Sequence, residues 1–320
     1  MSERVRLNPS LANGVLEAAE RGAIAASRLT GGGDKMAADQ AAVDAIRTAL
    51  NEIPMRGRIV IGEGERDEAP MLYIGEEVGT GEGPETDIAL DPLEGTTLCA
   101  KAWPSALSVI SIAPRGGLLH APDTYMNKIA VGPGYPDGVV DLDADSATNV
   151  KALAKAKGVD PAQITVCVLD RDRHDEVIAG IRSVGAKVFL IPDGDIAGII
   201  NTTNPEIGID MYIGRGAAPE GVLAASALRC VGGQMKGRLY FRNDDERERA
   251  TRLGVTDFDK IYDLTELASD DVIFVASGVT RGEMLDGVRW RGGDVETESL
   301  VMDSARGTVR RVRTRRAATA

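Results

Sequence analysis

A regular alternation of strand and helix patterns between Thr165 and Leu228 is the feature that most restricts the fold of this 320-residue chain. Apolar runs predict strands, and the segments between them have helical spacing. The predicted order is strand 164–169, helix 174–184, strand 187–191, helix 195–201, strand 208–213 and helix 219–231. Because parallel strands need a long, usually helical crossover, this order predicts an α/β layer with some parallel pairing.

The first half of the chain has a different pattern, in which long helices mix with hairpin-like strands. It predicts helices at 10–29 and 36–51 and strands at 58–61, 86–90, 107–113 and 127–131. The sequence thus predicts a mixed fold of α/β and α+β layers. The Gly- and Pro-rich stretch that opens the segment 132–150 marks the predicted boundary between two halves, 1–140 and 141–320.

Beyond the boundary, helices are also predicted at 146–157 and 244–253, and strands at 272–276 and 297–302. The basic tail from Arg310 to Arg316 alternates with Val309 and Val312. This alternation favours a solvated edge strand over a phosphate-binding arm.

Asp91-Pro92-Leu93-Glu94-Gly95-Thr96-Thr97 follows an apolar run that predicts a buried strand ending at Leu90. Pro92 and Gly95 then predict a turn, because one fixes φ and the other tolerates positive φ. Two carboxylates on such a turn can bind one divalent cation, and the backbone N–H groups of residues 95–97 can face an anion. Metal-assisted attack on a phosphate ester needs both features. The alternative is an acidic turn with a helix cap.

Further acidic residues could join this motif: Glu63 after strand 58–61, Asp39 on helix 36–51, Glu220 at the start of helix 219–231, and Asp193 and Asp195 after strand 187–191. Each also has a simpler explanation. Glu63 could lie on the surface, Asp39 could pair with Lys35 four residues earlier, and Glu220 could cap its helix. The turn Asp193-Gly194-Asp195 could be structural or could bind sugar hydroxyls.

Composition excludes several classes of function. A net charge of −12 argues against a nucleic-acid surface, which needs a basic face. His120 and His174 lack metal-ligand spacing, so oxygen ligands and hence Mg²⁺ or Mn²⁺ are favoured over zinc. Three scattered cysteines, no signal sequence and no apolar run long enough to span a bilayer predict a reduced, cytoplasmic protein without a membrane segment. The glycine fingerprints of dinucleotide and P-loop sites are absent from the sequence.

The segment from Asp91 to Thr96 resembles the metal-binding motif of the lithium-sensitive sugar phosphatases, which include inositol monophosphatases. Longer stretches are similar to the class II fructose-1,6-bisphosphatases, some of which also hydrolyse sedoheptulose 1,7-bisphosphate. These stretches are Gly33–Lys35, Ile59–Glu76, Ala121–Met126, Ile191–Asp195 and Ala218–Gly221. The resemblance covers about residues 10–315 and implies a sugar-phosphatase layered fold, like that of inositol monophosphatase, in a homodimer or homotetramer. It also implies metal-dependent removal of the 1-phosphate of fructose 1,6-bisphosphate, in gluconeogenesis or the Calvin cycle.

The resemblance also implies roles for individual residues and two or more Mn²⁺ or Mg²⁺ ions per subunit. Asp39 and Glu63 match ligands of one metal, and Asp91, Glu94 and Glu220 match ligands of a second. Thr96, Glu63 and Asp91 match catalytic positions, with Thr96 orienting the attacking water. The positions that match substrate contacts are Glu94, Gly95, Thr96, Tyr125, Arg171, Asp172, Arg173, Asp193, Gly194, Asp195 and Ala217. Residues 1–140 would then bind metal, and residues 141–320 would hold the sugar phosphate and supply one metal ligand.

Two positions depart from the family pattern. Asp172 stands where the family usually has Pro, and Ala217 stands where it usually has Gly. Both changes bear on substrate affinity and sugar preference. An inositol monophosphatase or a nucleotide-3′-phosphatase would share the metal residues but would have no use for Arg171 and Arg173. A non-catalytic sugar-phosphate sensor is the more distant alternative, although all five metal positions are acidic.

Overall fold

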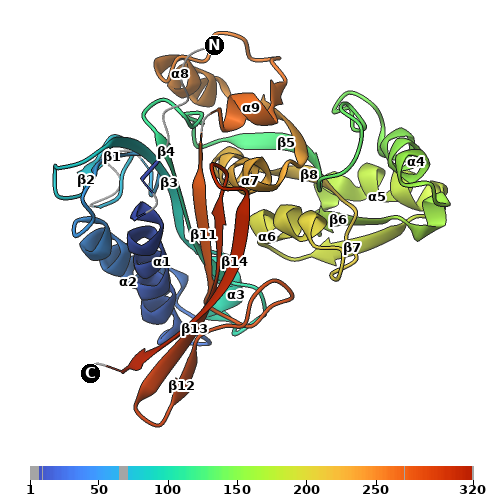
Figure 1. The fold of residues 1–320 in the computed structure, drawn as a ribbon. Helices are drawn as coiled ribbons and strands as arrows, with labels where there is room; N and C mark the ends of the chain where they lie inside the picture. Colours follow the sequence, from blue (N-terminus) through green and yellow to red (C-terminus); the bar gives the residue numbers. More distant parts are fainter. Residues whose placement is uncertain (1–6, 9, 65–70, 270, 319–320) are drawn as a thin grey trace. The chain divides into compact units, whose positions relative to one another are not determined.

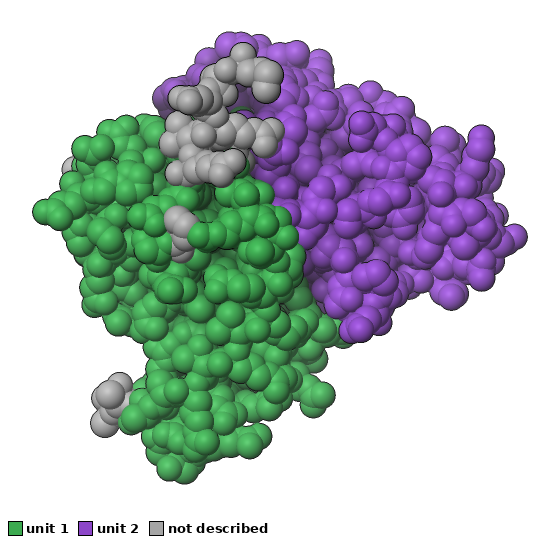
Figure 2. Space-filling model, in the orientation of Figure 1, with its two compact units in different colours: residues 1–119, 270–320 green, residues 120–269 purple. Residues whose placement is uncertain are grey.

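Two mixed β-sheets, each packed against helices, form the two units of the fold (Figure 1). The structure is a computed structural model that describes residues 7–8, 10–64, 71–269 and 271–318. The first unit consists of residues 1–119 and 270–320, and the second of residues 120–269 (Figure 2). The stretch Glu65–Pro70, which carries part of the family resemblance, lies outside the described residues.

The sheet of the first unit runs in the order β12-β13-β11-β4-β3-β1-β2, and β14 pairs with β13. Its strands are β1 (Arg56–Ile61), β2 (Glu77–Val78), β3 (Glu85–Glu94), β4 (Leu107–Pro114), β11 (Ile273–Gly278), β12 (Arg289–Arg291), β13 (Asp294–Asp303) and β14 (Thr308–Ala317). Only β1 and β3 are paired in parallel among the strands that the structure describes in this unit.

Helices α1 (Leu11–Ser27) and α2 (Lys35–Leu50) pack together and against this sheet. Asp34 caps α2, since its side chain accepts the Ala37 N–H at 3.0 Å. The apolar stripes of the two helices bury Leu11, Val15 and Ile46 against Ile88 and Ile110 of the sheet. Burying each side chain of this size stabilises the unit by about 1.5–3 kcal/mol relative to exposure.

The sheet of the second unit runs in the order β10-β9-β5-β8-β6-β7. Its strands are β5 (Tyr125–Val131), β6 (Thr165–Leu169), β7 (Lys187–Ile191), β8 (Met211–Ala217), β9 (Gln234–Tyr240) and β10 (Tyr262–Asp263). Strand β6 is parallel to both β7 and β8, which confirms the predicted parallel layer. Together with the first sheet it confirms the mixed α/β class.

Helices cover both faces of this second sheet. The helical segments are α4 (Ser146–Lys157), η1 (Pro161–Gln163), η2 (Asp172–His174), α5 (Asp175–Ser183), α6 (Asp195–Ile200), η3 (Asn201–Thr203), α7 (Ala218–Val231), α8 (Asp244–Arg252) and α9 (Leu264–Leu267). On one face, Leu153 of α4 and Ile181 of α5 pack against Ile129 and Val166. Helix α7 covers the other face, which carries Met126 and Lys128.

The division of the chain differs from the boundary predicted near residue 140. Strand β11 pairs antiparallel with β4, and Val275 lies opposite Ile110. The last strands therefore return to the first unit, although the whole second unit separates them from β4 in the sequence. Strands adjacent in a sheet are most often close in sequence. The pairing of β4 with the distant β11 departs from this tendency, and no local sequence pattern indicates it.

Several elements also begin or end at residues other than those predicted. Strand β3 does not end at Leu90 but continues to Glu94, and β9 was not predicted. The basic tail is strand β14, an edge strand as predicted. Among the described residues, the structure contains no helix with the length and apolar character needed to cross a lipid bilayer.

Candidate active site

A bulge in β3 brings the Asp91 and Glu94 carboxylates together. Asp91 lies opposite Val109 and Glu94 opposite Leu107, so β3 has one residue more than β4 in this interval. Pro92 lies in the interval and cannot donate a ladder hydrogen bond, which is why such a bulge accommodates it. Residues three apart in a regular strand point to opposite faces, but here one carboxylate oxygen of each residue lies within 4.8 Å of the other. Glu94 is buried, whereas Asp91 is half-buried.

Gly95 ends the strand and starts the short helix α3 (Thr96–Ala100). Its φ is 79°, and a Cβ at this position would lie 2.7 Å from Cδ1 of Leu98, so glycine is required here. The Gly95 carbonyl accepts the Cys99 N–H at 3.1 Å. The N–H groups of Thr96 and Thr97 belong to the first helical turn and have no intrahelical acceptor. The predicted acidic turn is thus a bulge followed by a helix start.

Asp39 and Glu63 form a second close pair of acid groups in the first unit. A hydrogen bond joins their side chains, and burial raises the pKa of Asp39 from 3.8 to about 6 although the Glu63 hydrogen bond opposes this. The alternative ion pair between Lys35 and Asp39 is absent from the part of the chain that the structure describes. Two carboxyl groups in contact need a shared proton or a cation to offset their repulsion. The pair therefore has the chemistry of a divalent-cation site.

This pairing predicts how pH and metal affect stability. The folded metal-free protein binds the Asp39 proton more tightly than the unfolded chain does, so this contribution to stability is lost as the pH rises from about 4 through about 6. We expect Mn²⁺ to raise the unfolding temperature strongly at pH 8 and weakly at pH 5, because binding requires the deprotonated carboxylates. Thermal unfolding of the metal-free protein, with and without Mn²⁺, measures this.

Asp44, an exposed residue on the same helix, provides the matched control. Asp39→Asn should weaken the Mn²⁺ effect, whereas Asp44→Asn should leave it unchanged. An equal stabilisation by Mn²⁺ in the Asp39→Asn variant would contradict the assignment of Asp39 as a ligand.

In the second unit, Glu220 lies in the first turn of α7. One of its carboxylate oxygens accepts the Ala217 N–H at 3.2 Å, so the capping explanation is confirmed. Its side chain also hydrogen-bonds the Asp195 carboxyl group, which a cap alone does not require. Ala217 ends β8 with φ −65°, a conformation open to alanine, so this departure from the family pattern causes no backbone strain.

A fully buried lysine, Lys128, contacts the same two residues that Glu220 bonds, Asp195 and Ala217. Lys128 of β5 forms an ion pair with Asp195 and donates to the Ala217 carbonyl at 2.9 Å. Burial acts to raise the pKa of Asp195, but the Lys128 charge and the hydrogen bonds that Asp195 makes with Glu220, Lys128 and the Tyr212 hydroxyl outweigh it, so the pKa is lowered. A Cβ on Gly216 would lie 2.1 Å from Oδ2 of Asp195, so only glycine leaves room for this pair.

The predicted sugar-phosphate residues lie around the ends of β5, β6 and β7. Arg171 approaches Asp193 to 4.0 Å, and Arg173 stacks over the Tyr125 ring at 5.1 Å. Asp172 is exposed in η2. His174 fixes this segment: its Nδ1–H donates to the Leu169 carbonyl, and its Nε2 accepts the Arg215 N–H, both at 2.8 Å. Burial lowers the pKa of His174, in agreement with this neutral form.

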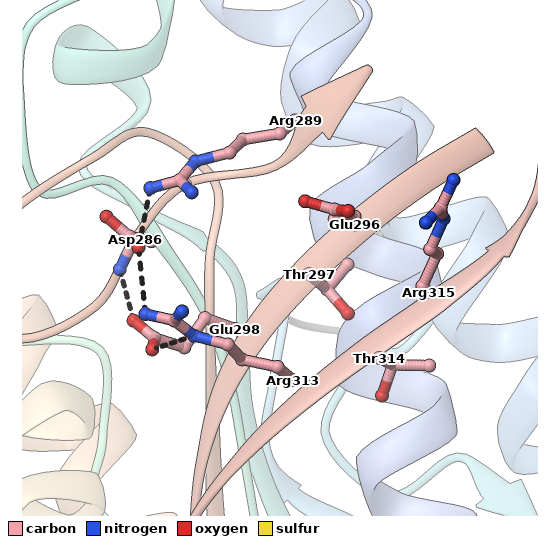
Figure 3. Close-up of a pocket in the computed structure, with 9 residues that line it drawn as sticks. Asp286, Arg289, Glu296, Thr297, Glu298, Arg313, Thr314 and Arg315 are labelled. Atoms are coloured by element: carbon pink, nitrogen blue, oxygen red, sulfur yellow. Dashed lines mark hydrogen bonds and ion pairs between the residues drawn. The ribbon is translucent and has the colours of Figure 1, made fainter. Parts of the chain in front are cut away.

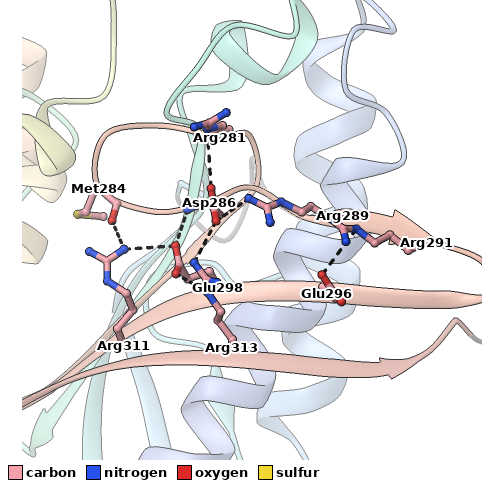
Figure 4. A network of polar contacts seen from close by, with 9 residues as sticks. All are labelled: Arg281, Met284, Asp286, Arg289, Arg291, Glu296, Glu298, Arg311 and Arg313. Atoms are coloured by element: carbon pink, nitrogen blue, oxygen red, sulfur yellow. Dashed lines mark hydrogen bonds and ion pairs between the residues drawn. The ribbon is translucent and has the colours of Figure 1, made fainter.

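A separate group of arginines, on strands β12 to β14, is neutralised by carboxylates. They line a cavity of about 220 Å³. In it Arg313 contacts Glu298 at 2.9 Å and Asp286 at 3.2 Å, the contacts drawn as dashed lines in Figure 3. In the wider network, Arg289 and Arg311 contact the same two acids (Figure 4). Because these cations already have anionic partners, this cavity has little charge left for a phosphate.

Within each unit the structure brings predicted residues together in groups: Asp39 with Glu63, Asp91 with Glu94, and Glu220 with Asp195 and Ala217. Thr96 is the first residue of α3, two positions after Glu94. Asp195 is almost fully buried, and its Oδ2 bonds Lys128 and the Tyr212 hydroxyl. The prediction that Asp195 contacts the sugar stays a prediction. The sequence reasoning missed Lys128. A lysine between Met126 and Ala130, on the inward-facing alternation of a strand, was the available signal.

These groups indicate the class of protein. Close carboxylate pairs, one of them directly before the start of a helix, are the residues that a metal-dependent hydrolase of phosphate esters needs. A family model supports this conclusion. The chain belongs to the bacterial, glpX-encoded fructose-1,6-bisphosphatases, whose model matches residues 9–316.

Curated relatives include the D-fructose 1,6-bisphosphatase class 2/sedoheptulose 1,7-bisphosphatases of Prochlorococcus marinus (strain AS9601) and Synechococcus sp. (strain JA-3-3Ab). They are 44% and 45% identical, over 95% and 94% of this chain and 95% and 93% of their own lengths. Among solved structures, the extragenic suppressor protein suhB from Bartonella henselae has a TM-score of 0.35 at 12% identity, covering 61% of this chain and 74% of its own. Inositol monophosphatase from Anabaena (Nostoc) sp. PCC 7120 has a TM-score of 0.30 at 12% identity, covering 60% of this chain and 71% of its own.

Proposed function

We propose that this protein hydrolyses the 1-phosphate of fructose 1,6-bisphosphate to give fructose 6-phosphate and inorganic phosphate. We include sedoheptulose 1,7-bisphosphate as a second substrate, because the relatives are named for both activities. The observation that carries the proposal is the occurrence of close carboxylate pairs in a chain that matches this family over almost its whole length.

The proposed metal ligands are Asp39 and Glu63 for one divalent cation and Asp91, Glu94 and Glu220 for another. The fit to a hard cation rests on the donor set, since all five are carboxylates, which suit Mg²⁺ and Mn²⁺. The close contact between Asp39 and Glu63 supports it further, because a cation relieves their repulsion. Bound there, such cations would lower the pKa of water and stabilise charge on the phosphate.

The protein's own residues would align and hold the reactants. The Thr96 hydroxyl would orient the attacking water, and Glu63 would accept its proton. The N–H groups of Gly95 and Thr96 would hold the phosphate oxygens, where charge increases during the reaction. Tyr125, Arg171 and Arg173 would bind the second phosphate through charge-assisted hydrogen bonds, and Asp193 with Gly194 would contact the sugar.

Metal removal tests this proposal directly. We expect phosphate release from fructose 1,6-bisphosphate to fall to background in excess EDTA and to recover when Mn²⁺ or Mg²⁺ is added, since the carboxylates alone cannot neutralise a phosphate ester. Release of phosphate from both bisphosphates is the measurement, with inositol monophosphate and a nucleoside 3′-phosphate as comparison substrates. Turnover that persists in EDTA, or a preference for a comparison substrate, would contradict it.

We also propose a homodimer or homotetramer, as the family resemblance implies. The molar mass in solution, measured by light scattering after size-exclusion chromatography, would decide between them.

A further inference from the structure

The second unit contains a cavity of about 410 Å³ whose charge differs from that of the cavity on β12 to β14. It lies over β5, β8 and β9, and its lining includes Arg173, Arg215 and Arg238. Two acids also line it. Asp145 caps α4, where its side chain accepts the Thr148 N–H at 2.7 Å, and Glu176 is exposed on α5. The three arginines of the lining differ in whether a carboxylate neutralises their charge.

Arg238 is neutralised. Its guanidinium donates to the Asp143 carboxylate at 2.7 Å and to the Asp259 carbonyl at 2.9 Å. Arg215 and Arg173 differ, because within the described residues neither forms an ion pair with a carboxylate. The lining therefore combines one satisfied arginine with two whose charge is available to an anion.

Arg215 is held in place by groups that do not neutralise its positive charge. Its Nε donates to the amide oxygen of Asn127 at 2.8 Å, and its guanidinium stacks over the Tyr240 ring at 3.5 Å. Stacking on an aromatic ring orders the planar guanidinium and leaves its edge for hydrogen bonding. The terminal N–H groups of Arg215 therefore remain as donors.

Arg173 is joined to Arg215 through the backbone. Its Nε and one terminal nitrogen donate to the Arg215 carbonyl at 3.1 and 2.7 Å. Its guanidinium lies over the Tyr125 ring, which Arg242 also approaches at 5.1 Å. Tyr125 and Tyr240 lie opposite each other on β5 and β9, so the stacked arginines gather over neighbouring rings.

We propose that Arg215, with Arg173, forms the subsite for the substrate phosphate that is not cleaved, and that Arg215 is a residue that determines specificity for bisphosphates. This inference rests on the proposed function and extends it to a residue that the family resemblance did not indicate. A phosphate monoester dianion suits the site, because ordered guanidinium groups recognise phosphate through charge-assisted hydrogen bonds. Preordering by Tyr240 and Asn127 reduces the entropy lost on binding.

The test compares Arg215→Gln with Arg238→Gln, which removes a neutralised arginine from the same cavity and sheet. Initial rates are measured with Mn²⁺ on fructose 1,6-bisphosphate and on fructose 1-phosphate, which lacks the distal phosphate. We expect Arg215→Gln to raise KM for the bisphosphate about 10- to 100-fold with little change in kcat. It should leave kcat/KM for fructose 1-phosphate unchanged. Arg238→Gln should leave kcat/KM unchanged for both substrates.

An unchanged KM for the bisphosphate in Arg215→Gln, or an equal loss on both substrates, would overturn the subsite. A wild-type protein that hydrolyses neither substrate would instead refute the proposed function itself. Circular dichroism checks that the variants fold. If Arg215→Gln does not fold, Arg215→Lys is used, which keeps the charge but loses the planar fork; it should raise KM for the bisphosphate by a smaller factor, and an unchanged KM would again count against the subsite.

Discussion

Replacement of Asp91 by asparagine should reduce phosphate release from fructose 1,6-bisphosphate by at least about 10²–10³-fold. Asparagine has nearly the same shape, and its side-chain oxygen can still accept the Leu93 N–H that Asp91 accepts at 3.1 Å. The bulge in β3 should therefore persist. What the variant loses is one negative charge beside Glu94, and with it the affinity of this pair for a divalent cation.

Glu85→Gln provides the control, because Glu85 is an exposed acid on the same strand and pairs only loosely with Arg56, at 3.7 Å. Both variants should give circular dichroism spectra like that of the wild type, and Glu85→Gln should keep full turnover at saturating Mn²⁺. Near-normal turnover in Asp91→Asn would mean that the bulge has a purely structural role.

Replacement of Lys128 by methionine should lower the free energy of unfolding by about 3–5 kcal/mol. The lysine side chain is fully buried, and without it the Asp195 carboxylate would have no cation in the protein interior. Since Lys128 also holds the Ala217 carbonyl, and Asp195 contacts Glu220, Mn²⁺ affinity should fall by about 10- to 100-fold. Urea unfolding and a Mn²⁺ titration of activity measure the two effects.

A double variant separates the buried charge from mere loss of packing. Lys128→Met with Asp195→Asn should be more stable than Lys128→Met alone, because no uncompensated charge remains. Lys236→Met, on neighbouring strand β9, is the matched control; its partly exposed pair with Asp263 at 3.8 Å should contribute less than about 1 kcal/mol. If the double variant were no more stable than the single one, the ion pair would not be the cause.

The elements that the sequence predicted best are those with a local signal. Helix α4 begins and ends where predicted, at 146–157, because Asp145 caps its start and Gly158, with φ 73°, ends it. The parallel pairing of β6 with β7 and β8 followed from the alternation of strands and helices. Periodicity and capping residues act over a few positions, so one sequence is enough to detect them.

The candidate site was only partly predictable, because its geometry depends on partners distant in the sequence. The acidic residues were identified by type and family resemblance, but the bulge that joins Asp91 to Glu94 arises from pairing with β4. Arg215 was missed because the predicted strand stopped at 213, whereas β8 continues to Ala217 and places this side chain beside Asn127. The stacking on Tyr240 joins two strands and leaves no pattern in either one.

In the sequence, the second unit is inserted between β4 and β11, two strands that pair with each other in the first unit. This insertion has a consequence for synthesis in the cell. Strand β4 leaves the ribosome early, but its partner β11 follows only after residues 120–269 have been translated. During that time one edge of β4 has no hydrogen-bonding partner. The inserted unit, in contrast, is translated as one uninterrupted segment and can fold first. We therefore expect the sheet of the second unit to be completed before that of the first, and the unpaired edge of β4 to be exposed to aggregation until then.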